Sequence, residues 1–181
     1  MFEKDLPGKN TAGFNEESVI GKLPLETCET MNNSWGFNLQ DSKYKSTKDL
    51  IQYLVKAAGN DANFLLNVGP MPNGKIQPEF VKTLEEMGKW LEKNGEAVYG
   101  TRGGIVPQKS WGVSTQKGNK TYLHILNAED SKLLITEITQ KVKKVSLLTN
   151  NQVLKFKQDN FGLVIELPKE LDKIDTILVV E

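Results

Sequence analysis

The stretch Asn63-Phe64-Leu65-Leu66-Asn67-Val68-Gly69-Pro70 decides the fold class of this chain. Its middle is almost wholly apolar, and a Gly-Pro pair ends it. A short apolar run of this kind is typical of a strand covered on both faces, as in a parallel sheet flanked by helices. We therefore expect a buried strand over residues 64–68, with a helix on either side of it in the sequence.

The residues before this strand predict a first helix. Ser46 and Asp49 stand three positions apart, a spacing in which each side chain satisfies a free backbone donor at a helix start. Gly59 offers the left-handed conformation that ends many helices. Between these ends, the apolar residues recur at helical spacing and form one stripe: Leu50, Ile51, Leu54 and Ala58.

The residues after the strand predict a second helix. It begins near Pro78, because proline is well tolerated in the first turn, and Gly95 closes it. Helix, buried strand and helix together are a fragment of an α/β pattern, with too few strands to form a closed sheet. The apolar positions of this second helix are Phe80, Leu84, Met87 and Leu91.

The chain changes character at the glycine pair Gly103-Gly104. Beyond it, short runs of β-branched and aliphatic residues alternate with turn signals, which predicts an antiparallel sandwich of roughly immunoglobulin size. We therefore divide the chain into residues 1–102 and residues 103–181. The expected strands are 111–115, 121–126, 133–136, 142–148, 153–157, 163–167 and 176–180.

Composition argues against several classes of partner. The 23 Lys and Arg residues balance 23 Asp and Glu residues, so neither nucleic acid nor an anionic membrane surface is expected. No apolar run is long enough to span a bilayer. The single Cys28 cannot form an internal disulfide and lacks the spacing of a zinc site, so we expect it to be a small buried residue. We expect no metal and no organic cofactor.

The chemistry is concentrated in the stretch Pro24–Asn38, which combines a carboxylate, several amides and an indole. Glu26 lies at the start of an expected strand. Partial burial there would raise the pKa of its carboxyl group, which could then hold a proton, as a general acid must. The alternative is an ordinary surface glutamate at a strand start. Glu29 would face the opposite side of the strand, so we do not expect the two carboxylates to form a dyad.

This stretch resembles the acid/base segment of the retaining α-L-fucosidases of glycoside hydrolase family 29. Residues 63–70, with Asn73-Gly74, look like that family's hallmark strand and turn, and residues 87–101 look like its following helix and exit. The resemblance is close over residues 1–102. The remainder is similar to the family's C-terminal domain only in position and character.

The resemblance implies a fold, a reaction and a location. The expected fold class is α+β: a partial (β/α)-barrel segment followed by an antiparallel β-sandwich. Family members hydrolyse α-L-fucosyl linkages by double displacement, with carboxyl groups ~5–5.5 Å apart. Glu26 matches the acid/base glutamate, although Leu25 replaces a common tryptophan, which alters the packing behind the carboxyl. A fucosylated glycan is the implied substrate, and a periplasmic or secreted enzyme is the implied location.

The family's aspartate nucleophile and fucose-binding residues lie upstream, and no residue here matches them. The aspartates of residues 1–100 read as loop, cap or turn residues, and His124 reads as a packed or surface strand residue. The resemblance therefore implies a C-terminal portion that is inactive alone, completed by an N-terminal barrel half on the same chain or on a separate one. The aspartates in question are Asp5, Asp41, Asp49 and Asp61.

Two further residues are candidates for substrate binding. Trp35 is expected either to stack on the apolar face of fucose or to be a core tryptophan. Asn67 lies near the carboxyl end of the expected strand, the end where barrel enzymes build their sites, or else has a structural role. A different class of function also stays open: a non-catalytic β-sandwich that supports a partner domain or binds carbohydrate. The scattered aromatic residues of its strands favour support.

Overall fold

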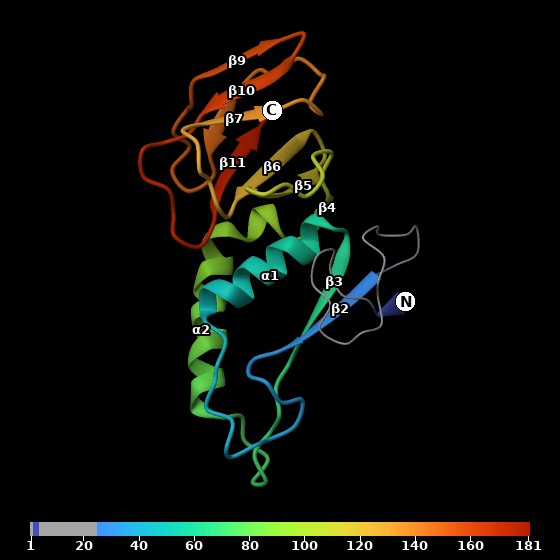
Figure 1. The fold of residues 1–181 in the computed structure, drawn as a ribbon, viewed down its shortest axis with the longest axis vertical. Helices are drawn as coiled ribbons and strands as arrows, with labels where there is room; N and C mark the ends of the chain where they lie inside the picture. Colours follow the sequence, from blue (N-terminus) through green and yellow to red (C-terminus); the bar gives the residue numbers. More distant parts are fainter. Residues whose placement is uncertain (1, 4–24) are drawn as a thin grey trace.

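A parallel sheet forms the first part of the molecule. The computed structural model describes residues 2–3, by their backbone, and residues 25–181. Strands β1 (Phe2–Glu3), β2 (Leu25–Thr30) and β3 (Ala62–Asn67) run parallel in the order β1-β2-β3. The carboxyl ends of β2 and β3 lie at the same edge, toward the lower end of the molecule in Figure 1.

The first helix, α1 (Thr47–Gly59), begins after the predicted cap residue Ser46, but within the described residues the Asp49 side chain does not bond a backbone donor as predicted. The Ser46 hydroxyl oxygen accepts a hydrogen bond from the Asp49 backbone N–H at 3.1 Å and donates to the Asp49 carboxylate at 2.6 Å. The Asp49 side chain thus bonds the Ser46 hydroxyl, and the cap is closed between two side chains.

Helix α1 ends at the predicted residue, but not through the predicted left-handed conformation of Gly59. Gly59 is the last helical residue, and the left-handed residue is Asp61, with φ 56°. Gly59 is needed for close packing instead, because a Cβ atom there would lie 2.6 Å from the Cβ of Val113. Gly95 is not left-handed either: its φ is −60°, and the chain continues into a 3-10 helix, η1 (Gly95–Ala97).

Helix α1 is buried on two sides, which the single expected stripe did not foresee. Leu50, Ile51 and Val55 pack in one cluster with α2 (Pro78–Asn94), whereas Tyr53 and Ala57 pack in another, toward β3. In α2 the buried residues are Phe80, Met87, Trp90 and Asn94, while Leu84 is exposed and Leu91 is half-buried.

Strand β3 is covered on one face only, so the prediction of a strand covered on both faces is wrong. The rings of Phe64 and Tyr53 lie 5.0 Å apart, centroid to centroid, and cover the face toward α1. On the other face Asn63 is exposed and Leu65 is 42% exposed. The apolar run therefore overstates the burial of this strand within the described residues.

The second part of the molecule consists of two antiparallel sheets. One has the strand order β4-β5-β6-β11-β8 and the other the order β7-β10-β9. The seven expected strands all appear in order, although the one expected at 153–157 begins at Phe156, because Val153 forms only an isolated bridge to Ser146. The bounds are β4 (Arg102–Gly103), β5 (Gly112–Lys117), β6 (Lys120–Ile125), β7 (Lys132–Ile135), β8 (Val145–Leu147), β9 (Phe156–Asp159), β10 (Gly162–Glu166) and β11 (Thr176–Val180).

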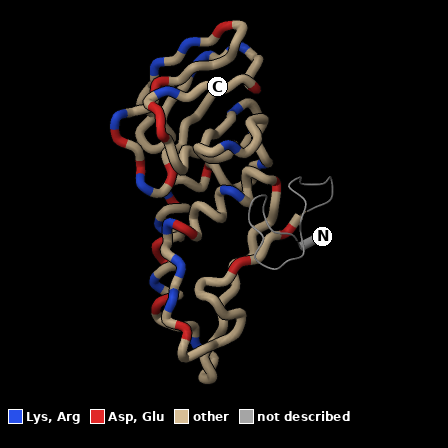
Figure 2. The backbone as a smooth tube through the Cα atoms, viewed as in Figure 1, with Lys and Arg blue, Asp and Glu red and all other residues tan. Residues whose placement is uncertain are grey.

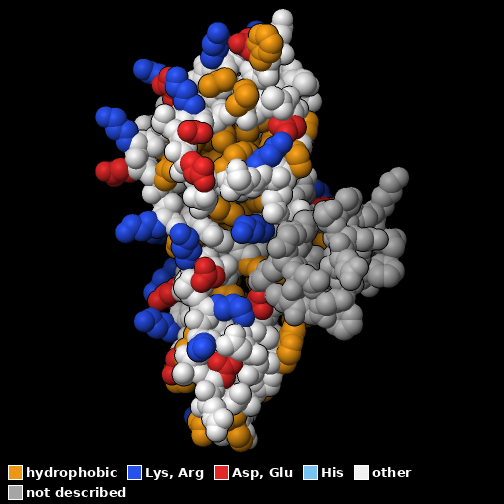
Figure 3. Space-filling model, viewed as in Figure 1, with side chains coloured by type: hydrophobic (Ala, Val, Ile, Leu, Met, Phe, Trp, Pro, Cys, Tyr) orange, Lys and Arg blue, Asp and Glu red, His pale blue; other side chains and the backbone are white. Residues whose placement is uncertain are grey.

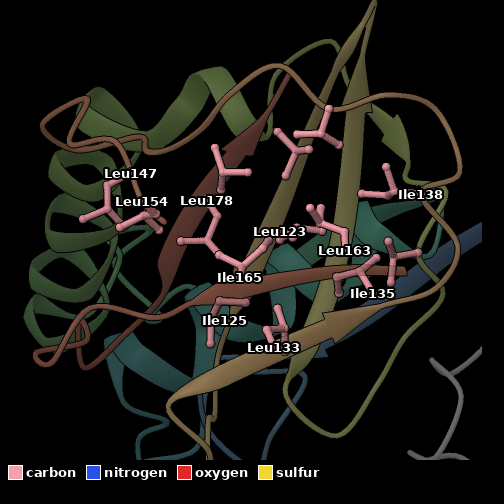
Figure 4. Packing of buried hydrophobic residues seen from close by; sticks show 14 residues of the cluster. Leu123, Ile125, Leu133, Ile135, Ile138, Leu147, Leu154, Leu163, Ile165 and Leu178 are labelled. Carbon is pink, nitrogen blue, oxygen red and sulfur yellow. The ribbon is translucent and has the colours of Figure 1, made fainter. Parts of the chain in front are cut away.

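The two antiparallel sheets face one another across a common aliphatic core (Figure 4). Leu123 and Leu178 from the five-stranded sheet meet Leu163 and Ile165 from the three-stranded one, and all four are fully buried. Such burial is the main source of folding free energy in a domain.

The five-stranded sheet is buried on its other face as well. Along β11, Leu178 and Val180 point into the core between the sheets, whereas Ile177 and Val179 belong to the cluster that contains α1 and α2. This alternation is the two-residue period of a strand. In broad terms the chain is mostly β with two helices, and no sheet closes on itself within the described residues.

His124 is a core residue, as one of the two predicted alternatives has it. It is fully buried, and its Nδ1 lies 2.7 Å from Oδ2 of the equally buried Asp175. Its Nε2 lies 3.0 Å from Oγ1 of Thr115, whose hydroxyl donates to the carbonyl oxygen of Ala97 at 2.7 Å. This chain of hydrogen bonds joins β5, β6 and the start of β11 to the end of η1.

Charged residues of the two signs are interspersed along the described part of the chain. Figure 2 shows Lys and Arg alternating with Asp and Glu along α2 and over the antiparallel sheets, with no block of one sign. In residues 2–3 and 25–181, neither helix combines the length and apolar character needed to cross a bilayer.

Removing one member of the buried His124–Asp175 pair should destabilise the fold strongly. We expect Asp175→Asn to lower the free energy of unfolding by about 3–5 kcal/mol, because the imidazole loses its carboxylate partner without access to water. Urea denaturation followed by circular dichroism measures this. Glu166→Gln, on the exposed side of β10, is the control and should change little; an equally small effect of Asp175→Asn would contradict the structural role.

Candidate active-site end of the parallel sheet

Glu26 lies in the first half of β2, with its side chain half-buried. In the parallel register it stands opposite Asn63 of β3, and the Asn63 side-chain amide donates a hydrogen bond to Oε2 of Glu26 at 2.6 Å. This contact holds one oxygen of the Glu26 carboxylate.

Glu29 has a separate environment, as the sequence predicts. Its carboxylate accepts a hydrogen bond from the Thr30 backbone N–H at 3.0 Å and lies 3.2 Å from the Lys45 ammonium. That ammonium also donates to the carbonyl oxygens of Thr30 at 2.9 Å and Asn32 at 2.7 Å. Glu29 and Lys45 therefore tie the chain after β2 to the segment leading into α1, and Glu29 forms no dyad with Glu26.

Trp35 and Asn67 lie together at the carboxyl ends of the strands. The Asn67 side-chain amide donates to the backbone carbonyl oxygen of Trp35 at 2.7 Å. The Trp35 side chain is 58% exposed, so the alternative of a core tryptophan is not what the structure shows. The backbone of Gly69 packs against this loop so closely that a Cβ atom there would lie 2.4 Å from the carbonyl carbon of Gly36.

Asp41 organises the loop that carries Trp35. Its carboxylate accepts hydrogen bonds from the Asn33 backbone N–H at 2.9 Å, the Ser34 hydroxyl at 3.0 Å and the Lys43 backbone N–H at 3.2 Å. Desolvation opposes the charge of Asp41, but these hydrogen bonds and the nearby Lys45 outweigh it and lower the pKa of the carboxyl below its ordinary value.

The structure brings two of the three predicted site residues together and leaves the third apart. Asn67 pairs with Thr30, and Glu26 lies four residues earlier on β2. At about 3.3 Å per residue, this separation is about 13 Å along the strand. Trp35 and Asn67 share the carboxyl end of the sheet, whereas Glu26 lies on β2 toward the amino end of the sheet.

Sequence reasoning missed several residues at this end of the molecule. Asn63 stands in the quoted apolar stretch, but only the register of β2 and β3 shows that it meets Glu26. Lys45 and Asp41 carried no motif that would have set them apart. Asp49 and Asp61 occupy the cap and turn positions expected of them, and Asp5 lies outside the described residues.

No group of three or more His, Cys, Asp or Glu side chains suited to a metal ion occurs in the part of the chain that the structure describes. Cys28 is half-buried on β2 rather than fully buried.

Comparisons with known proteins show the family of this chain. A family model of alpha-L-fucosidases matches residues 1–96, more than half of the chain. The chain belongs to the alpha-L-fucosidase family. Human tissue alpha-L-fucosidase is 33% identical over 153 residues, a match that covers 80% of this chain and 33% of the human protein.

Two solved structures extend the likeness to the fold. Alpha-L-fucosidase isoenzyme 1 from Paenibacillus thiaminolyticus matches with a TM-score of 0.82 and 29% identity, over 98% of this chain and 43% of that chain. A GH29 alpha-L-fucosidase from Bacteroides thetaiotaomicron matches with a TM-score of 0.78 and 25% identity, over 87% of this chain and 38% of that one. This chain thus spans about a third of the human protein and less than half of either bacterial one.

Lys45 should prove essential for the stability of this end of the fold. We expect Lys45→Met to lower the free energy of unfolding by about 2–3 kcal/mol, because it removes the ammonium group that contacts the buried Glu29 carboxylate and the carbonyl oxygens of Thr30 and Asn32. Urea unfolding checks this. Lys43→Met, two residues away and exposed, is the matched control; equal effects of the two substitutions would contradict the assignment.

Proposed function

We propose that this chain supplies part of the catalytic unit of a retaining α-L-fucosidase acting on terminal α-L-fucosyl groups of glycans. In this proposal residues 1–102 are a segment of a (β/α) barrel and residues 103–181 are a β-sandwich. The observation that carries the proposal is the family match over residues 1–96 together with the conserved arrangement of the fold in solved fucosidases.

A relative supports the retaining mechanism. The Bacteroides structure is of a covalent intermediate, trapped with 2-fluoro-fucosyl fluoride in a glutamate-to-glutamine mutant. A covalent glycosyl-enzyme is the intermediate of double displacement, in which one carboxylate attacks the sugar and another carboxyl group donates a proton. We propose the same course for the enzyme to which this chain contributes, in a periplasmic or secreted setting and without a metal.

Glu26 is the proposed general acid/base. Its carboxylate is half-buried and held by Asn63, which would orient it toward a leaving-group oxygen. Against this stands its place toward the amino end of β2, since enzymes built on parallel barrels place catalytic groups at the carboxyl ends of strands. The role of Glu26 is therefore the part of the proposal to test first.

The nucleophile has no candidate among the aspartates of residues 25–100. Asp41 is saturated by hydrogen bonds within its loop, Asp49 caps α1, and Asp61 lies in the turn before β3. We propose that the attacking aspartate belongs to a barrel half outside this sequence, on the same polypeptide or on a partner.

The proposed function can be tested with a chimera. In it, this chain replaces the matching 43% of the Paenibacillus enzyme, which leaves that enzyme's own remaining portion in place. We expect the chimera to release 4-nitrophenol from 4-nitrophenyl α-L-fucoside, and we expect this chain alone to release none. A well-folded chimera without activity, as judged by circular dichroism, would contradict the proposal.

The acid/base role of Glu26 predicts a dependence on the leaving group. In the chimera, Glu26→Gln should slow cleavage of fucosides with poorly acidic leaving groups by about 10²–10⁴-fold, because they need protonation, and activated aryl fucosides much less. Rate constants for a series of aryl fucosides measure this. Glu85→Gln, an exposed carboxylate on α2 remote from β2, is the control. A uniform loss over the series would show that Glu26 is structural.

The second candidate function, a supporting module formed by residues 103–181, also has specific evidence. Val113 and Tyr122 of the five-stranded sheet share a core with α1 and α2, and the Tyr122 hydroxyl donates to the Glu96 carboxylate at 2.8 Å. Glycan capture is less well supported. The hollow beside Trp111 holds about 100 Å³, less than the ~300 Å³ of a typical small-ligand pocket, and the larger hollow of about 610 Å³ beside Leu147 and Ile177 has no aromatic side chain in its lining on which a sugar could stack.

A further inference from the structure

The loop Asn32–Asp41, called here the indole loop, presents a large apolar side chain without help from the core. Trp35 is 58% exposed and Leu39 is 86% exposed. Apolar side chains are visible at the lower tip of the molecule in Figure 3, the end to which the loops after β2 and β3 extend in Figure 1. Because the indole has little packing around it, its placement depends on the backbone of the loop.

The backbone of this loop contacts Asn67 at the end of β3 and Gly69 in the turn that follows β3. The Asn67 side chain donates to the carbonyl oxygen of Trp35 itself, at 2.7 Å. Gly69 lies against Gly36 and Phe37, where a Cβ atom would come within 2.6 Å of the Phe37 nitrogen. These contacts fix the position of the Trp35 backbone relative to the carboxyl end of β3.

The loop is also fastened within itself. Asp41 accepts hydrogen bonds from Asn33 and Ser34 on the near side of Trp35 and from Lys43 on the far side. Its carboxylate thus closes the loop around the tryptophan, and hydrogen bonds to a charged acceptor are stronger than those between neutral groups.

We infer that Asn67 and Asp41 are positioning residues that hold Trp35 as a sugar-stacking platform beyond the carboxyl end of β3. Asn67 then acts through the Trp35 backbone, in the structural role that the sequence left open beside substrate binding. The indole would meet the apolar C–H face or the methyl group of a 6-deoxy sugar. The nature of this ligand rests on the proposed function, whereas the positioning of Trp35 does not.

The positioning is tested on this chain without any ligand. In a Trp90→Phe, Trp111→Phe background, Trp35 is the single tryptophan, whose fluorescence is excited selectively over that of the tyrosines. Asn67→Asp keeps the size of the side chain but removes its donor, and Asp41→Asn removes the carboxylate. Both should lower the fluorescence anisotropy of Trp35 and increase its quenching by acrylamide. Asn63→Asp, on the same strand, should change neither; unchanged signals in both loop variants would overturn the inference.

The platform is tested in the chimera with a fucose-configured iminocyclitol. Trp35→Ala should weaken inhibitor binding, and Asn67→Asp should weaken it by up to about tenfold, the equivalent of one hydrogen bond. Binding that both variants leave unchanged would overturn the platform. A chimera that binds no inhibitor before mutation would instead count against the proposed function, while the anisotropy result would still decide the positioning.

Discussion

The packing of the five-stranded antiparallel sheet on helices α1 and α2 is the constraint on which the rest of the structure depends. Ile177 and Val179 of β11 enter the same core as Leu50, Ile51 and Val55 of α1. Contact is close enough that Gly59 has no room for a Cβ atom beside Val113. Because α1 carries Tyr53 on its other side, this one interface also places β2 and β3.

As a consequence for function, α1 and the strands β2 and β3 support the loops that follow the two strands. Strand β2 is joined to α1 by the hydrogen bond between Thr27 Oγ1 and the Tyr53 hydroxyl, at 2.7 Å. At the carboxyl ends of β2 and β3, Lys45 binds the first loop from one side and Asn67 binds it from the other. Polar contacts of the loop backbone thus position the exposed indole of Trp35. The hydrophobic core influences this position only by holding β2 and β3 in place.

Much of this fold could be predicted from the sequence, because local patterns report local structure. The Ser46 cap, the helix from Pro78 and the seven strands after Gly104 each follow from spacing or turn residues. The errors arise where the environment of a residue is set by contacts with residues that are distant in the sequence. Gly59 was interpreted as a helix stop, but it serves the contact with Val113; Leu65 was expected to be buried, but it lies on the face away from α1.

The candidate site was predictable only in part, for the same reason. The motif around Glu26 and Trp35 directed attention to this loop. The sequence could not show that Glu26 meets Asn63 while Asn67 meets Trp35, since both pairings depend on the register of β2 and β3. Asp41 and Lys45 act through loop closure, for which no sequence signal was present.

The central claim is that sugar is met at the carboxyl ends of β2 and β3, under the Trp35 indole. A crystal structure of the chimera with a bound fucose-configured iminocyclitol tests it most directly. The account predicts the inhibitor ring or its methyl group against the Trp35 indole, with Asn67 still bonded to the Trp35 carbonyl. An inhibitor bound elsewhere on the molecule, with Trp35 in contact with solvent alone, would contradict it.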